Sequence, residues 1–170
     1  WAVLTGAPLT TVVERLRPES LFERFLDYRR SLGMEVLPLG ADNLSTVLTD
    51  RLRFGRLVCL VADRDLSASG IPVDFFGEPA KCPPGPAALA VQTGAALIPA
   101  DLWYEPDRLI IRFHPEIPVP AAARLREKVV GMTRDLAKIY EHGIAEHPDD
   151  WHMLQRFWPA DAPAGARPDR

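Results

Sequence analysis

The feature that most constrains the fold of this chain is an apolar run that ends in two aspartates. The run reads LVCLVADRD and covers Leu57–Asp65, with Asp63 and Asp65 at its end. Because its apolar residues continue without alternation, it predicts a strand that is buried on both faces. Such strands belong to parallel sheets covered by helices, and functional groups collect beyond their carboxyl ends. We therefore expect both carboxylates at a sheet edge suited to chemistry.

Strands and amphipathic helices alternate along the rest of the chain. The expected strands are residues 9–15, 34–39, 57–65, 73–76, 97–104 and 109–114. The expected helices are residues 18–32, 43–54, 86–93 and 120–147, and the opening residues 1–6 are interpreted as the end of another helix. This alternation predicts an α/β fold, a layered sheet with flanking helices.

Length and charge restrict the class of protein. With 170 residues and 47% hydrophobic content, the chain suits one domain with a substantial core. We expect residues 1–158 to belong to that domain and residues 159–170, rich in Pro, Ala, Gly and charge, to form a loose tail. The net charge of -3 and the absence of a basic run interleaved with aromatics argue against a nucleic-acid partner.

The two cysteines do not form a recognisable redox or metal motif. Cys59 lies in the apolar run and is expected to be a small core residue, whereas Cys82 lies in a Pro-rich stretch and is expected to be exposed. Cys82 has no neighbouring histidine in the sequence, and no GxSxG pattern occurs. An acyl-enzyme formed on a nucleophile of this chain is therefore not expected.

Several segments, in collinear order, resemble one family of enzymes. They are ERLRPESLFERFLDYRRSLG (14–33), VLPL (36–39), LVCLVADRDLSASG (57–70), VDFFGEPAKCPPGPAALAVQTGAALIP (73–99) and HPDDWHMLQRFWP (147–159). Together they resemble the lipid A and phosphatidylinositol mannoside acyltransferases, the late-acylation branch of the lysophospholipid acyltransferase superfamily. The resemblance implies a glycerolipid-acyltransferase-like fold and transfer of a fatty acyl group from acyl-CoA to a hydroxyl of a membrane glycolipid. It also implies a peripheral position on the membrane surface, at the cytoplasmic face of the bacterial inner membrane, and no cofactor besides the donor.

The defining His-x4-Asp motif of that family does not occur in these 170 residues. None of the four histidines has an aspartate five positions later. In family members the motif comes shortly before the equivalent of Trp1. We therefore expect this chain to be the carboxyl-terminal major part of an acyltransferase domain, with its histidine base upstream and little activity of its own.

Three residues receive roles that need the resemblance. Asp63 takes the position of the carboxylate that orients the catalytic histidine, where close relatives often carry Glu; a carboxylate that caps the adjoining turn is the alternative. Arg29 lies on the apolar stripe of helix 18–32 and matches a recurring arginine of the family, which favours donor binding over a structural ion pair. Glu14 is a further substrate-binding candidate, and a surface pair with Arg17 explains it equally well.

Further positions have weaker signals. Ser69, in a Ser/Gly loop, and Gln92, which faces out of an Ala-rich helix, are candidate contacts for the donor and the acyl groove; ordinary turn and surface roles compete. Asp65 is interpreted as a structural residue, because alternate residues of a strand point to opposite sides. The aromatic residues between 151 and 158 are expected to pack rather than to face a membrane.

Two other classes of function compete with acyl transfer. Asp63-Arg64-Asp65 also fits the DxD pattern with which some glycosyltransferases hold a divalent metal ion. Alternatively, the chain is a binding module that retains a groove for lipid or donor without the base.

Overall fold

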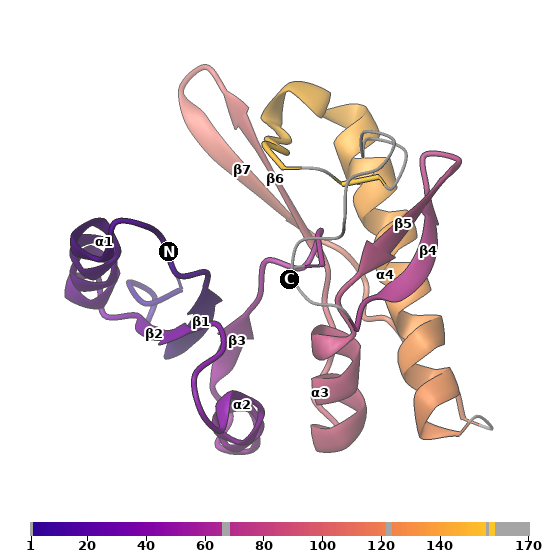
Figure 1. Ribbon diagram of the computed structural model, residues 1–170, viewed down its shortest axis with the longest axis horizontal. Helices are drawn as coiled ribbons and strands as arrows, with labels where there is room; N and C mark the ends of the chain where they lie inside the picture. The colour runs from indigo at the N-terminus through magenta and orange to yellow at the C-terminus, as the bar shows by residue number, and fades with distance from the viewer. Residues whose placement is uncertain (1, 66–68, 122–123, 156, 159–170) are drawn as a thin grey trace. The chain divides into compact units, whose positions relative to one another are not determined.

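The computed structural model describes residues 2–65, 69–121, 124–155 and 157–158 (Figure 1). These residues form two compact units. Unit 1 runs to Val61 and includes Gln92–Ala95, while unit 2 comprises Ala62–Val91 and the described residues from Ala96 onward. Each unit has its own hydrophobic core. Helices and strands are mixed along the chain, so the α/β class is confirmed; among the described residues the strands form one three-stranded sheet and two hairpins.

Unit 1 is a three-stranded parallel sheet with two helices. The strands are β1 (Leu9–Val13), β2 (Glu35–Pro38) and β3 (Leu57–Cys59), in the order β2-β1-β3. The connecting helices are α1 (Glu19–Ser31) and α2 (Leu44–Arg53). Parallel neighbours need a crossover connection, and α1 and α2 supply the two crossovers of this sheet.

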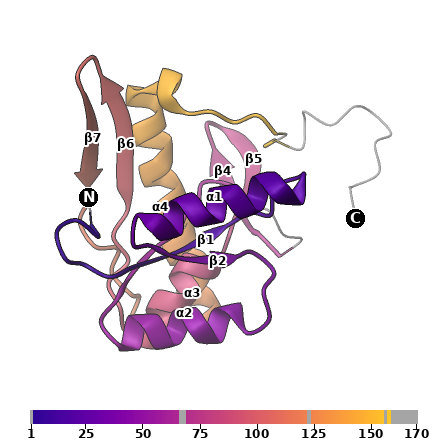
Figure 2. The same ribbon diagram turned by 90° about the vertical axis from the view of Figure 1, so that its left-hand side faces the viewer.

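The two helices of unit 1 face opposite sides of its sheet (Figures 1 and 2). On one side the core consists of Val13, Phe22, Leu26 and Val36. On the other side the hydroxyl of Thr10 and the guanidinium of Arg51, from α2, both donate to the carboxylate of Glu35. Because successive strand residues alternate between faces, one side is apolar and the other contains an ion pair.

Unit 2 consists of two β-hairpins and two α-helices. Its elements are β4 (Ile71–Phe75), β5 (Glu78–Cys82), α3 (Gly85–Thr93), β6 (Ala100–Glu105), β7 (Arg108–Phe113), α4 (Leu125–Glu146) and the short 3-10 helix η1 (Pro148–Asp150). Helix α4 packs on the β4–β5 hairpin through Ala137 and on α3 through Met132 and Leu136. The long helix therefore links both core clusters of the unit.

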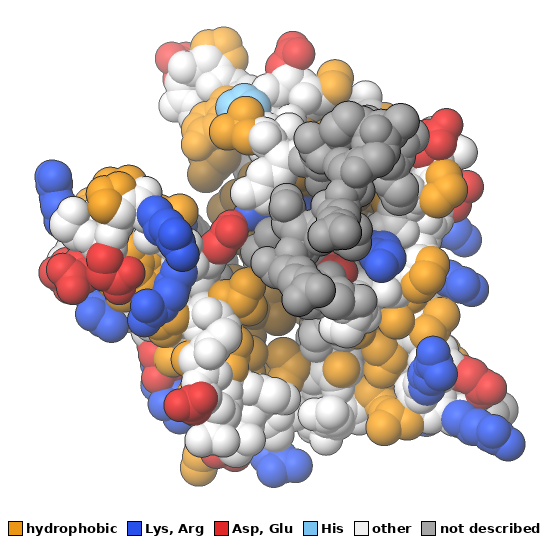
Figure 3. Space-filling model, in the orientation of Figure 1, with side chains coloured by type: hydrophobic (Ala, Val, Ile, Leu, Met, Phe, Trp, Pro, Cys, Tyr) orange, Lys and Arg blue, Asp and Glu red, His pale blue; other side chains and the backbone are white. Residues whose placement is uncertain are grey.

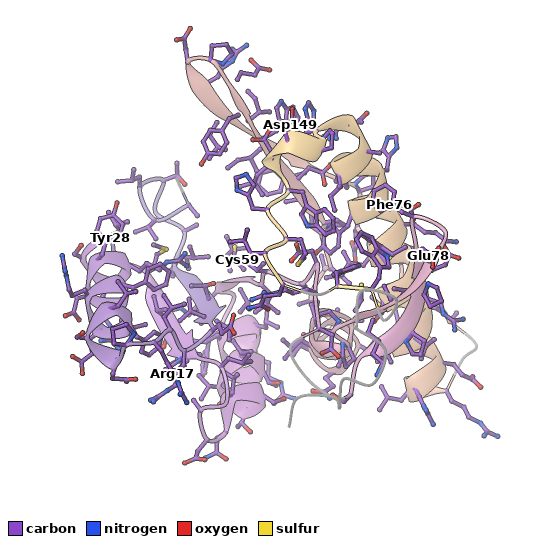
Figure 4. All side chains as sticks on the ribbon, turned by 45° about the horizontal axis from the view of Figure 1, so that its top comes forward. Arg17, Tyr28, Cys59, Phe76, Glu78 and Asp149 are labelled. Atoms are coloured by element: carbon purple, nitrogen blue, oxygen red, sulfur yellow. The ribbon has the colours of Figure 1, made fainter. Side chains whose placement is uncertain are left out.

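The β4–β5 hairpin is the element that the sequence prediction missed. Phe76 and Gly77 both have positive φ, 55° and 79°, as the two-residue turn of a tight hairpin requires. The Gly77 N–H donates to the Asp74 side chain at 3.1 Å and closes the turn. Figure 4 labels Phe76 and Glu78 on either side of Gly77. The residues expected to begin a Pro-rich loop instead form β5, which ends at Cys82.

The predicted strand 57–65 is wrong in length and in burial. Strand β3 ends at Cys59, and Val61 is 86% exposed. Within the described residues, β3 pairs with β1 alone and forms the edge of its sheet, so its apolar pattern does not correspond to burial on both faces. Cys59, expected in the core, is exposed and is labelled on β3 in Figure 4, whereas Cys82, expected to be exposed, is buried.

The other boundaries follow the sequence closely. Helices α1, α3 and α4 begin and end within a few residues of the predictions. Asn43 occupies the predicted cap of α2, but it has a left-handed backbone and makes no side-chain capping bond. Residues 2–6 form turns rather than the end of a helix, with hydrogen bonds from Thr5 to Ala2 and from Gly6 to Val3.

The β6–β7 hairpin exposes an apolar face. Cross-strand pairing places alternate residues on one side, and the exposed large side chains there are Leu102, Tyr104, Leu109, Ile111 and Phe113. None of the described helices is both long enough and apolar enough to cross a membrane.

Candidate functional site

Asp63 lies in the segment between β3 and β4, within unit 2. Its Oδ2 accepts a hydrogen bond of 2.9 Å from the indole Nε1–H of Trp151. Its negative charge also acts on the Cys82 thiol of β5 and on the Tyr140 phenol of α4. Asp63 is only half-buried, so the carboxylate is anchored in the protein and still reaches solvent.

The two neutral neighbours of Asp63 stay neutral near pH 7. Burial, and then the charges of Asp63 and Asp65, raise the pKa of the Cys82 thiol to about 11. Burial, and then the charge of Asp63, raise the pKa of Tyr140 above its ordinary value. A thiol in this state is a poor nucleophile, which agrees with the expectation that this chain forms no acyl-enzyme.

Cys59 is exposed and Cys82 is buried, the reverse of what the sequence predicts, and this difference leads to a first testable prediction. At pH 8, a small thiol reagent should modify Cys59 and leave Cys82 almost unmodified. Burial raises the pKa of both thiols, but Cys59 is exposed to the reagent, whereas Cys82 is 1% exposed and has two nearby carboxylates that raise its pKa further, to about 11. Mass spectrometry of the labelled peptides measures both sites in one sample. Denaturant provides the control, since unfolding should make the two cysteines react at similar rates. Equal labelling in the native protein would contradict the placement of Cys82.

Asp63 and Asp65 do not lie in a strand, because β3 ends at Cys59, so the alternation expected of strand residues does not apply to them. Both carboxylates contribute to the raised pKa of the Cys82 thiol. The Asp65 carboxylate packs against Gly70 so closely that a Cβ there would lie 2.2 Å from Oδ2. Gly70 is thus required for a close approach. Between the two aspartates, Arg64 donates to the Gln155 side chain.

An aromatic cluster surrounds the Trp151 side of the site. The rings of Phe75 and Phe157 lie 6.0 Å and 5.5 Å from that of Trp151, and Trp158 lies 6.2 Å away. The Trp158 Nε1–H donates to the Phe75 carbonyl at 3.2 Å. These residues join the core cluster of β4, β5 and α4, so the prediction that they pack is confirmed.

Arg29 and Glu14 both lie in unit 1, at opposite ends of its parallel strands. Glu14 is exposed and directly follows β1, at the carboxyl ends of the strands. Arg29 is near the end of α1, which leads back to the amino ends of the strands, where β2 begins. Its guanidinium lies 4.4 Å from the centre of the Phe25 ring and is half-buried there. One compact group, such as a phosphate, cannot therefore contact both residues.

The two weaker candidates are both exposed. Gln92 lies near the end of α3 and faces out of the helix as predicted. Ser69 lies in the loop before β4, and residues 66–68 of the same loop, including Ser67, fall outside the described residues, as does the predicted tail 159–170. Around α1, Figure 3 shows acidic and basic side chains side by side rather than a patch of one sign.

A second charged cluster escaped the sequence prediction. The Asp101 carboxylate, 9% exposed, lies 2.6 Å from His114 Nε2 and 2.9 Å from the Arg112 guanidinium. Arg112 also pairs with Glu146 of α4. Asp101 and Arg112 are direct cross-strand partners, and the two-residue turn at Pro106-Asp107 fixes that register, so the sequence held a usable signal. The cluster fastens the β6–β7 hairpin to α4.

Comparison with known proteins identifies the family. Residues 1–159 match the family described as bacterial lipid A biosynthesis acyltransferase, and the chain belongs to that family. The chain is also 48% identical over 163 residues to the phosphatidylinositol mannoside acyltransferase of Mycobacterium tuberculosis (strain ATCC 25618 / H37Rv). Its identity to the protein of the same name from Mycolicibacterium smegmatis is 48% as well.

These alignments cover 95% of this chain but only 50% and 52% of the two relatives. The chain thus spans about half the length of the curated relatives it matches. The family match puts the chain among acyltransferases rather than glycosyltransferases, so the DxD interpretation is not retained. Within the described ranges, no three His, Cys, Asp or Glu side chains are grouped to hold a metal ion.

Proposed function

We propose that the protein containing this chain transfers a fatty acyl group from acyl-CoA to a hydroxyl of a membrane glycolipid of the phosphatidylinositol mannoside class. The observation that carries the proposal is the anchored, half-buried Asp63 carboxylate in a chain of the acyltransferase family. The names of the two mycobacterial relatives support the acceptor class.

In the proposed reaction, Asp63 orients a histidine base that lies before Trp1 in the full-length protein. The carboxylate accepts the N–H of one ring nitrogen and holds the other nitrogen ready to take the proton of the acceptor hydroxyl. The alkoxide oxygen attacks the thioester carbonyl, a tetrahedral intermediate forms, and the C–S bond breaks. The thiolate of coenzyme A leaves and takes up the proton, so the products are an ester and free coenzyme A.

The remaining candidates are assigned to the donor and the acyl groove. Arg29, stacked on Phe25, offers a fixed cation for a phosphate or a thioester carbonyl. Glu14, Ser69 and Gln92 are proposed as further substrate contacts, and their exposure leaves them accessible. We place the reaction at the cytoplasmic face of the bacterial inner membrane, with the protein attached peripherally.

A reconstituted assay tests the proposal. The full-length protein is incubated with radiolabelled acyl-CoA and vesicles that contain a mannosylated phosphatidylinositol, and the lipids are then separated. We expect a labelled, more acylated glycolipid and release of coenzyme A in equal amount, with no effect of a chelator. Vesicles with phosphatidylinositol that lacks mannose are the matched acceptor control. Transfer from an acyl carrier protein but not from acyl-CoA would overturn the donor assignment, and absence of transfer from both would overturn the function.

A further inference from the structure

We propose that Trp151 is a positioning residue: its indole N–H holds the carboxylate of Asp63 in the orientation that the base requires. The catalytic consequence rests on the proposed acyl transfer, whereas the hydrogen bond itself can be tested separately. The two side chains come from segments 88 positions apart in the sequence. The inference therefore assigns a role in the site to the segment that follows η1.

The direction of this hydrogen bond suits a positioning role. An indole Nε1–H is a donor only, and an ionised carboxylate is an acceptor only, so the bond cannot reverse. Trp151 meets Oδ2 at 2.9 Å, which leaves Oδ1 as the oxygen for the histidine N–H. A hydrogen bond to a charged acceptor is stronger and more directional than one between neutral groups. Such a bond restrains rotation of the Asp63 carboxylate about its Cβ–Cγ bond.

The indole is itself held firmly on several sides. Phe75, Phe157 and Trp158 contact it within the aromatic cluster. On the preceding side, the Asp150 carboxylate of η1 accepts the backbone N–H of Tyr104 at 3.2 Å, which connects this segment to β6. The backbone N–H of Trp151 itself donates to the Pro148 carbonyl at 3.2 Å. Because ring contacts and this backbone bond both hold Trp151, the indole can impose an orientation on Asp63 rather than follow it.

Trp158 provides a matched control in the same cluster. It is also half-buried and also donates its indole N–H, but to the Phe75 carbonyl instead of a carboxylate. Replacing either tryptophan by phenylalanine removes one indole hydrogen bond and keeps an aromatic ring. The Trp158 variant therefore measures the effect of losing an indole ring and its N–H within this cluster without loss of the hydrogen bond to Asp63.

The first experiment does not depend on activity. In the full-length protein labelled with 15N-tryptophan, the indole N–H signals of residues 151 and 158 are assigned through their disappearance in Trp151→Phe and Trp158→Phe. Asp63→Asn should move the Trp151 indole signal clearly and leave that of Trp158 nearly unchanged. A Trp151 signal that does not respond to Asp63→Asn would overturn the hydrogen bond and the inference with it.

The second experiment measures catalysis. By analogy with groups that orient active-site ligands, Trp151→Phe should lower kcat about 10-fold to 100-fold with little change in KM, whereas Trp158→Phe should stay within about 3-fold of the parent. Equal losses in both variants, or a change in KM alone, would overturn the positioning role. If the parent protein transfers no acyl group, the proposed function fails, and the spectra still decide whether Trp151 holds Asp63.

Discussion

Replacing Asp63 with alanine lowers kcat for acyl transfer at least about 100-fold in the full-length protein, while KM for acyl-CoA changes little. The size of the loss follows from the contribution of an oriented base, since a histidine without its carboxylate adopts the wrong tautomer and orientation. Because the carboxylate does not contact the donor in the proposed reaction, the effect should appear in kcat. Initial rates over a range of acyl-CoA concentrations measure both constants.

Asp65→Asn is the matched control for this prediction. Asp65 lies two positions away, acts electrostatically on the same Cys82, and packs against Gly70 instead of accepting the indole of Trp151. We expect Asp65→Asn to retain activity within about 5-fold, because it keeps the size of the side chain and removes only a structural charge. Full activity of Asp63→Ala, or an equal loss in both variants, would refute the special role of Asp63.

The amphipathic helices of the fold could be predicted from the sequence. Helix α1 has apolar residues at helical spacing and a proline at its start; of these apolar residues Phe22 and Leu26 are buried, whereas Leu21 and Leu32 are exposed. Helix α4 buries Met132 and Leu136 of its apolar stripe and exposes Leu125 at its start. In both cases the local pattern and the tertiary packing agree, which is the condition under which patterns are informative.

The elements that failed depend on tertiary context. An apolar run such as Leu57–Ala62 does not state how many neighbours its strand will have, and β3 is an edge strand in the described structure. The β4–β5 hairpin was missed because its turn places Phe76, a residue that disfavours positive φ, at the first turn position. Both errors reversed the predicted environments of Cys59 and Cys82.

The candidate site likewise contains one residue that a local pattern indicated and partners that only the tertiary structure shows. Asp63 stood out because two carboxylates follow an apolar run, but its partner Trp151 lies 88 positions later and no local pattern connects them. The sequence predicted that Trp151 packs, and its ring does pack in the aromatic cluster. The prediction did not include the hydrogen bond from its indole N–H to Asp63. Asp101 received no role, although the turn at Pro106-Asp107 fixes the register that pairs it with Arg112, so this contact could have been predicted. The contact between Asp63 and Trp151 has no such local signal, and contacts of that kind are the part that sequence reasoning could not supply.

A half-buried ion pair in unit 1 should make its stability depend on acid. Arg51 donates to both oxygens of Glu35, at 2.7 Å and 2.8 Å, and the hydroxyl of fully buried Thr10 donates at 2.7 Å. The hydrogen bonds from Arg51 lower the pKa of Glu35 from 4.5 to about 2, against the opposing effect of its burial. Arg56 adds a weaker attraction, with its guanidinium 3.8 Å from the carboxylate.

The direction of the pH effect follows from that lowered pKa. The unfolded chain takes up a proton on Glu35 near pH 4.5, whereas the folded chain does so only near pH 2. The stabilising contribution is therefore complete above pH 4.5 and is lost as the pH falls from there to about 2. Allowing for the 24% exposure of the side chain, we expect a loss of about 1 to 2 kcal/mol over this interval.

Glu35→Gln should remove this dependence at its origin. The amide keeps the size of the side chain but removes the countercharge of a partly exposed Arg51, so the free energy of unfolding at pH 7 should fall by about 1 to 2 kcal/mol. Hydrogen exchange of the β1 and β2 amides between pH 7 and pH 3 reports on unit 1 separately from unit 2. The parent should lose protection below pH 4.5, and the variant should start lower and lose less. Glu105→Gln, which breaks only an exposed pair with Arg108, is the control and should change stability by less than about 0.5 kcal/mol. A parent and a Glu35→Gln variant with identical acid dependence would show that this ion pair does not stabilise the sheet.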